Sequence, residues 1–172
     1  MGWRLLVLLG LALAGCEKKP APPAAPAAPA ASASGPRAKL LARIGNINDP
    51  NTPCPLVSLA EFFEGNNDPG SIGYNLPDSP SPQEWYELLK QIAERPEVRD
   101  VRIQVMDLED PDGWPSTDTI WIITTASSKE VRGWLPKRIA PDDVIEGFPK
   151  SGSPVEAYEV PPGYMAVGLW YD

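Results

Sequence analysis

The sequence predicts an α+β fold, in which helices cover one face of an antiparallel sheet, after a disordered N-terminal segment. Two observations support this prediction. Each of three expected helices opens with a serine that stands three residues before a glutamate, an arrangement typical of helix N-termini. Around them lie segments rich in β-branched and aromatic residues, which are typical of strands. Both kinds of segment fall within residues 37–172, a length that suits a single domain with its own core.

Each of the three expected helices begins with a capping box. In this motif the serine hydroxyl accepts from a backbone N–H, and the glutamate carboxylate accepts from the backbone N–H of the serine. The boxes occupy residues 58–61, 81–84 and 127–130. The first helix should stop near Gly65. The second should run to about Arg95 and the third should end at Pro136, because proline disrupts a helix.

Five segments are candidates for strands. Residues 101–105 alternate apolar and polar side chains, residues 119–125 are β-branched or aromatic, and residues 164–171 are mostly apolar. Residues 71–76 are a weaker candidate, bounded by glycine and proline. Residues 155–160 are expected to form an edge strand, because prolines follow them.

The order of these segments indicates a topology. With residues 137–163 taken as an insertion, the chain reads strand, helix, strand, strand, helix, strand. This order resembles the ferredoxin-like split βαβ arrangement, which implies an antiparallel sheet with its helices on one face. The two central strands should pair as a hairpin, since they are adjacent in sequence.

The first sixteen residues predict export. Arg4 precedes an apolar run over residues 5–14, which is shorter than the roughly 20 residues that a membrane-spanning helix needs. Small residues follow at the expected cleavage point. The sequence Leu13-Ala14-Gly15-Cys16 resembles the lipobox of bacterial lipoprotein precursors. The resemblance implies that residues 1–15 are a signal peptide, that Cys16 is lipidated, and that fatty acids such as palmitate anchor the chain. An ordinary secretory signal with an incidental Cys16 is the alternative.

Lipidation at Cys16 would keep the protein on a membrane surface, because two or more acyl chains hold a protein stably. Glu17 stands where an Asp would resemble an inner-membrane retention signal. We therefore expect an outer-membrane location in the cell envelope, with the domain facing the periplasm. Residues 16–36 are rich in Ala and Pro, which predicts a disordered linker with a reach of roughly 60 Å.

Charge and composition exclude several functions. Residues 37–172 hold 12 basic and 22 acidic side chains, a net charge of −10, which repels nucleic acid. The chain has no His, so Ser-His-Asp and Cys-His catalysis are excluded. We expect no cofactor, since no glycine-rich phosphate loop is present. Cys54 lies between two prolines, and we favour a buried, inert thiol over a reactive or intermolecularly paired one.

Acidic residues concentrate between the two central strands, where residues 107–118 contain five carboxylates. Ca²⁺ prefers such oxygen ligands, but the EF-hand spacing fails, and we favour a solvated connecting loop without a metal. Asp107 and Asp118 offer a pair that could act as acid and base on a glycosidic bond. Trp114 lies in the same loop, where it either folds back onto the domain or contacts a partner.

A second acidic group follows the third expected helix. Asp142, Asp143 and Glu146 should begin a further helix, since carboxylates are favourable at the positive end of the helix dipole. They form a second acidic patch, which lies in the insertion. The residues assigned to partner binding are Trp114, Asp110, Asp112, Asp142 and Asp143.

These observations predict an envelope lipoprotein whose non-catalytic acidic domain binds a protein partner of basic character. Some immunity proteins, which protect the envelope against a toxin, are broadly similar small acidic α+β domains. The alternative is a cell-wall polysaccharide binder or hydrolase that uses Asp107, Asp118 and Trp114. The two differ in their ligand, a basic protein or purified peptidoglycan.

Overall fold

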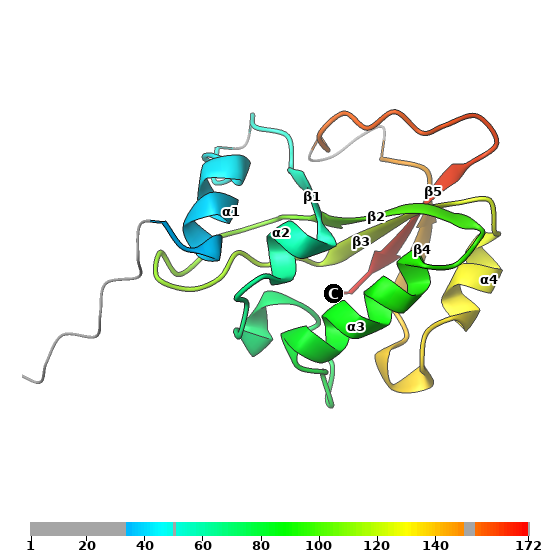
Figure 1. Cartoon of the computed structure of the whole chain (residues 1–172), viewed down its shortest axis with the longest axis horizontal. Helices are drawn as coiled ribbons and strands as arrows, with labels where there is room; N and C mark the ends of the chain where they lie inside the picture. Colours follow the sequence, from blue (N-terminus) through cyan, green and yellow to red (C-terminus); the bar gives the residue numbers. More distant parts are fainter. Residues whose placement is uncertain (1–33, 50, 150–153, 172) are drawn as a thin grey trace, which may run out of the picture. The chain divides into compact units, whose positions relative to one another are not determined.

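A five-stranded antiparallel sheet forms the centre of the fold, with the strand order β1-β2-β3-β5-β4 (Figure 1). The computed structural model describes residues 34–49, 51–149 and 154–171. Residues 1–33, which hold the predicted signal peptide, Cys16 and most of the predicted linker, lie outside these ranges. In chain order, the strands β1 to β5 are Leu56–Ser58, Val98–Gln104, Thr119–Thr124, Asp143–Glu146 and Met165–Trp170. The helices α1 to α4 are Pro36–Ile44, Leu59–Phe63, Pro82–Ala93 and Ser128–Gly133.

The predicted α+β class and the three predicted helix starts are confirmed. At α3, the Ser81 N–H donates to Glu84 Oε2 at 2.9 Å and the Glu84 N–H donates to Ser81 Oγ at 3.3 Å. The same reciprocal pair opens α2 at Ser58 and α4 at Ser127. Each box satisfies N–H groups that a helix leaves without intrahelical partners, so the local sequence sets where these helices begin.

Replacing Ser81 by alanine should lower the free energy of unfolding by about 1 kcal/mol, because the Glu84 N–H loses its acceptor. Hydrogen bonds from the Ser81 backbone and side chain lower the pKa of Glu84 below its ordinary value of 4.5. The capping box therefore stabilises the folded state fully at pH values above 4.5, and this stabilisation is lost as the pH falls through the lowered pKa of Glu84. Denaturant unfolding at pH 7 and in acid measures both effects. Gln91→Ala on the exposed side of α3 should change stability by less than about 0.5 kcal/mol, and an equal loss in both variants would contradict the role of the box.

The three main strands predicted from sequence are also confirmed, and β2 and β3 pair as the expected hairpin. Ile103 lies opposite Ile120 in that pair, and Ile120 lies opposite Leu169 of β5. The strand order differs from the interleaved order of a ferredoxin-like sheet. Here β1 lies directly beside β2, although α2 and α3 separate the two strands in sequence.

The two faces of the sheet are covered differently. On one face, alternate strand residues pack with α1, α2, α3 and α4 into the main core. Its strand members are Val57, Val101, Ile103, Ile120, Ile122, Val167 and Leu169. The other face has a smaller core, on which Phe148 and side chains of residues 154–164 pack without regular strands or helices. The helices therefore lie on one face, as predicted, and irregular chain covers the other.

Trp121 is the largest side chain of the smaller core, and its ring lies over Gly168 of the neighbouring strand. A Cβ atom on Gly168 would lie 2.8 Å from Cζ3 and 2.9 Å from Cη2 of the indole. The indole N–H donates to Gln104 Oε1 at 2.8 Å, and the ring centroid is 4.6 Å from that of Phe148. Glycine is thus needed at position 168 because the indole occupies the space of a side chain.

Two strand predictions were wrong. At the start of the segment 71–76 the chain forms a 3-10 helix, Pro69–Ser71, instead of a strand. Asp68 caps this helix by accepting from the Gly70 N–H at 2.8 Å. Gly73 then adopts a φ of +59°, which lies outside the extended region of regular strand backbone. In the segment 155–160, Val155 alone forms a bridge, to Cys54. Side chains rather than a ladder hold the rest of this segment.

Two other expectations need correction. Asp142, Asp143 and Glu146 do not begin a helix, because Asp143–Glu146 is the edge strand β4, paired with β5. The helix α1 was not predicted, and Pro36, assigned to the linker, is its first residue. Proline suits the first helical position, where its missing N–H costs nothing.

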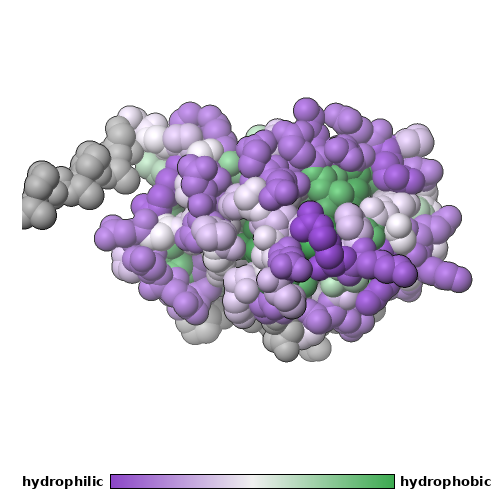
Figure 2. Space-filling model, turned by 90° about the horizontal axis from the view of Figure 1, so that it is seen from below, coloured by the Kyte–Doolittle hydropathy of each residue, from purple (hydrophilic) through white to green (hydrophobic). Residues whose placement is uncertain are grey.

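Hydrophilic residues cover most of the face in Figure 2, with hydrophobic residues visible between them in limited areas. Within the described ranges, no helix combines the length and apolarity that a membrane span requires. Among large hydrophobic side chains in the same ranges, Tyr74 is the one that is exposed, at 68% of its surface.

Candidate functional site: an acidic pocket beyond β2 and β3

The hairpin of β2 and β3 continues past its strands as a narrow stem. The Met106 N–H donates to the Ser116 carbonyl at 2.9 Å, and the Ser116 N–H donates to the Asp107 carbonyl at 2.8 Å. Asp107 and Ser116 thus form an antiparallel bridge. Asp107 and Asp118 are thereby placed on opposite arms of one paired stem.

The tip of this loop is closed by its own turn and fixed by α1. The Gly113 N–H donates to the Asp110 carbonyl at 2.9 Å, and the Asp112 N–H donates to Asp110 Oδ1 at the same distance. Arg37 of α1 donates to the carbonyls of Gly113 and Pro111. The loop therefore contains a turn over residues 110–113, and Arg37 holds this turn against α1.

The segment after the 3-10 helix Pro69–Ser71 forms the opposite wall. The Thr117 N–H donates to the Ser71 carbonyl at 2.9 Å, and Ile72 forms a parallel bridge with Thr117. Two residues later Tyr74 stands exposed. The bridge therefore holds an exposed aromatic ring opposite the acidic stem.

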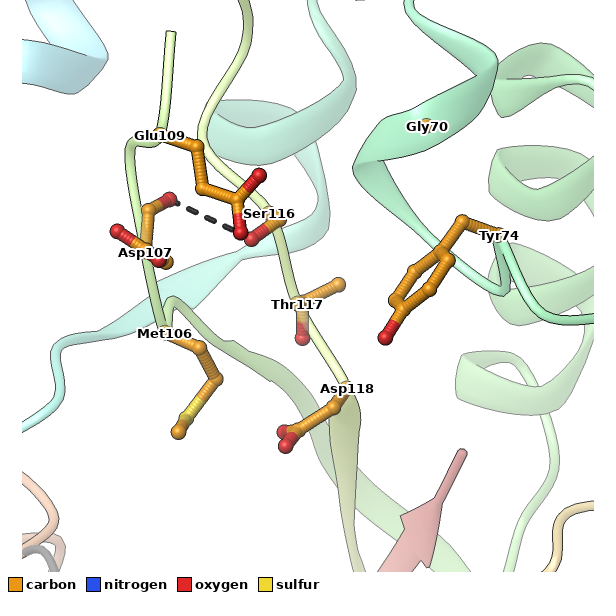
Figure 3. Close-up of a pocket in the computed structure, with 8 residues that line it drawn as sticks. All are labelled: Gly70, Tyr74, Met106, Asp107, Glu109, Ser116, Thr117 and Asp118. Carbon is orange, nitrogen blue, oxygen red and sulfur yellow. Dashed lines mark hydrogen bonds between the residues drawn. The ribbon is translucent and has the colours of Figure 1, made fainter. Parts of the chain in front are cut away.

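Between the two walls lies an open cavity of about 450 Å³. Figure 3 shows Asp107 and Glu109 on one arm of the stem, Asp118 on the other, and the Tyr74 ring reaching toward Thr117 and Asp118 from across the cavity. The lining residues are Gly70, Tyr74, Met106, Asp107, Glu109, Ser116, Thr117 and Asp118. Three carboxylates and no basic side chain line the cavity in the part of the chain that the structure describes.

Hydrogen bonds orient two of these carboxylates. Asp118 Oδ1 accepts from the Thr119 hydroxyl at 2.7 Å, and Asp107 Oδ1 accepts from the Leu108 N–H at 2.6 Å. Glu109 is exposed. Negative charge on held carboxylates next to an aromatic ring attracts an ammonium or guanidinium group, through ion pairing and through the face of the ring.

The predicted partner-binding residues are only partly brought together. Asp142 is not part of the cavity lining, but Asn75, next to the lining residue Tyr74, donates through Nδ2 to Asp142 Oδ2 at 3.4 Å. Asp143 lies at the start of β4, and its Oδ1 accepts from the Val144 N–H at 2.8 Å. This hydrogen bond gives Asp143 a structural role.

Trp114, Asp110 and Asp112 lie at the loop tip, outside the cavity lining. Trp114 is half-buried and packs against the main core, and its backbone N–H donates to Asp68 Oδ2 at 3.3 Å. Of the two alternatives for Trp114, the structure shows the ring folded back onto the domain. Asp110 shapes the turn, and Asp112 is exposed to solvent.

Burial raises the pKa of two other groups near this end of the sheet. The pKa of Tyr171 is raised by burial and by the nearby charge of Asp142, and its hydroxyl donates to the Ile139 carbonyl. The pKa of the Cys54 thiol is raised by burial and by the charge of Asp118. This shift disfavours the reactive thiolate, but Cys54 is only partly buried, not fully buried as expected from the sequence.

Carboxylates do not converge into a metal site within the described ranges, where no three of the His, Cys, Asp and Glu side chains come close enough to hold one ion. The Ca²⁺ alternative for residues 107–118 therefore has no support from the geometry.

Tyr74 was missed by the sequence reasoning. An aromatic residue between Gly73 and Asn75 is the local signal, but its role depends on the bridge from Ile72 to Thr117, which is distant in the sequence.

Comparison with known proteins identifies a family. The family model described as the uncharacterized protein YfbO family matches residues 35–169. The chain is 42% identical over 128 residues to the uncharacterized protein YfbO of Escherichia coli (strain K12), and the match covers 74% of this chain and 90% of that protein. No solved structure matches significantly. The matched range includes nearly the whole sheet, the acidic pocket and all four helices, and the chain belongs to the YfbO family.

Proposed function

We propose that the chain is a lipid-anchored protein of the cell envelope, whose acidic domain binds a basic group on a protein partner. The observation that carries this proposal is the pocket itself, in which Asp107, Glu109 and Asp118 face an exposed Tyr74. The lipobox at residues 13–16 supports the anchor, and the net charge of −10 supports a cationic partner. No His is present to supply the commonest acid–base chemistry, which favours binding over catalysis.

The geometry suits one inserted Lys or Arg side chain. A cavity of about 450 Å³ has room for a long side chain, and its walls offer several carboxylates together with the apolar surface of Met106. Arg is enriched at the centres of protein interfaces, where it pairs with carboxylates and stacks on aromatic rings. The immunity-like version of this proposal would have a toxin as the partner.

Asp118→Asn should weaken partner binding by about tenfold, because it removes one charge from the pocket and keeps an oxygen for the Thr119 hydroxyl. Tyr74→Ala should have a similar effect, since aromatic side chains are common anchors of interfaces. The experiment crosslinks the full chain in isolated envelopes and compares recovery of the partner between variants. Binding should also fall with salt, as expected for charge pairs.

Glu94→Gln is the matched control. Glu94 is an exposed carboxylate at the end of α3, just before β2 begins, whereas the pocket lies beyond the end of β2. This variant should bind as the wild type does. Equal recovery of the same protein by wild type and by the Asp118 and Tyr74 variants would show that the pocket is not the binding site.

A second candidate function is binding or cleavage of a cell-wall polysaccharide. It is favoured by one observation, namely that Asp107 and Asp118 share a concave site with an aromatic ring, since sugars stack on such rings and hydrogen-bond to carboxylates. Sedimentation of the full chain with purified peptidoglycan distinguishes the two functions. Retention that Tyr74→Ala abolishes would favour the polysaccharide.

A further inference from the structure

The smaller core is covered by a segment that has few backbone bonds to the sheet. We call residues 154–164 the strap. Within the described ranges, its backbone is joined to the rest of the domain at Cys54, where the Cys54 N–H donates to the Pro154 carbonyl at 2.7 Å and the Glu156 N–H donates to the Cys54 carbonyl at 2.9 Å. Side chains of the strap, including Tyr158 and Val160, pack on the apolar face formed by Leu56, Trp121, Ile123 and Ala166.

Glu156 makes the strongest polar attachment of the strap. One of its oxygens, Oε2, lies 2.7 Å from Arg43 Nη2 of α1 and also accepts from the Leu56 N–H of β1 at 2.8 Å. The other oxygen accepts from the same arginine nitrogen at 2.9 Å. One carboxylate therefore joins the strap to a helix and to a strand at once, through charge-assisted hydrogen bonds.

Further charges surround this carboxylate on each neighbouring element. Glu61 of α2 lies 3.9 Å from Arg43. Arg102 of β2 pairs with Asp100 at 2.7 Å, and Asp100 accepts from the Tyr158 hydroxyl of the strap at 2.8 Å. If Glu156 loses its charge, Arg43 loses its shortest ion pair. The contact at Tyr158 remains, but it lies two residues further along the strap.

We propose that the strap is a reversible cover fastened by Glu156, which opens when this carboxylate is protonated and uncovers the apolar second face of the sheet. The side chains of Glu156 and Arg43 are each 38% exposed, so solvent protons reach the pair directly. Segments with few backbone hydrogen bonds open locally at a lower free energy than the core does. The sheet under the strap keeps its own ladders, since β3 pairs with both β2 and β5.

The direction of the pH dependence follows from the contacts. Burial disfavours the charge on Glu156, but the hydrogen bonds from Arg43 and from the Leu56 N–H outweigh it and lower its pKa below the ordinary value of 4.5. The closed strap is therefore stabilised above that value and loses this stabilisation as the pH falls through the lowered pKa. The strap is therefore expected to open at low pH and to stay closed at neutral pH.

Hydrogen exchange of the full chain, followed by NMR, tests the proposal at three reporter amides: Cys54, Leu56 and Glu156. In Glu156→Gln at pH 7 their protection should fall about tenfold, as expected from the loss of a charge-assisted hydrogen bond, while the amides of β3 keep theirs. In the wild type, the same pattern should develop as the pH is lowered stepwise from 7 through the lowered pKa of Glu156, after correction for the intrinsic exchange rate.

Glu159→Gln is the matched control, since Glu159 is an exposed carboxylate of the same strap. It should leave the reporter amides unchanged at pH 7. Three results would overturn the proposal: unchanged protection in Glu156→Gln, an equal loss in Glu159→Gln, or a parallel loss at the β3 amides, which would mean that the domain unfolds as a whole.

Discussion

Cys16→Ser should move the protein from the membrane fraction to the soluble fraction and abolish incorporation of a clickable fatty acid. Each buried methylene of an acyl chain contributes about 0.8 kcal/mol, so the proposed anchor would supply most of the affinity for a bilayer. The domain would not replace the anchor, because the net charge of −10 on residues 37–172 is repelled by anionic lipids.

The second cysteine of the chain supplies the control. Cys54→Ser should keep both the fatty-acid label and the membrane location, because Cys54 lies within the domain, between Pro53 and Pro55. Label that persists in Cys16→Ser would contradict lipidation at this site. A wild-type chain that is exported but takes up no label would identify residues 1–15 as an ordinary secretory signal.

Gly168→Ala should lower the free energy of unfolding by about 1–3 kcal/mol, the usual range for overpacking. Replacing glycine by alanine commonly stabilises a protein, because the unfolded chain loses freedom. The sign reverses here because the new Cβ would lie under 3.0 Å from two carbon atoms of the Trp121 ring. The ring cannot move aside easily, since Gln104 accepts from its N–H and Phe148 packs on it.

Two further variants test whether the Trp121 ring causes the loss of stability in Gly168→Ala. Gly133→Ala, at the last position of α4, meets no atom within 4 Å, so it should stabilise the protein by about 0.4–1 kcal/mol. Combining Gly168→Ala with Trp121→Leu should remove most of the cost of the alanine, which a double-mutant cycle measures by denaturant unfolding. If the alanine costs the same with and without the Trp121→Leu substitution, the indole is not the cause.

The features that the sequence predicted well are those that local chemistry determines. A capping box involves residues three positions apart, so Ser58, Ser81 and Ser127 indicated helix starts without knowledge of the fold. The three main strands were recognisable because apolar and β-branched residues dominate them. The acidic loop was recognisable from composition, and three of its five carboxylates, those of Asp107, Glu109 and Asp118, line the pocket.

The features that sequence reasoning missed depend on distant contacts. Asp142 and Asp143 favour a helix start locally, but β4 forms because Val144 and Ile145 pair with β5, far along the chain. Tyr74 is placed at the pocket by the bridge between Ile72 and Thr117. Neither pairing leaves a periodic pattern in the segment itself, so single-sequence periodicity could not detect them.

The hydrogen bond from the Val144 N–H to Asp143 Oδ1 has a consequence at the rim of the sheet. β4 is the outermost strand on its side, and a bare outer strand is a template for pairing with another molecule. Here a carboxylate already occupies one backbone donor of that strand and adds negative charge beside it. If the chain is lipid-anchored as proposed, its copies would meet often on the membrane surface, and this aspartate would disfavour edge-to-edge pairing between them.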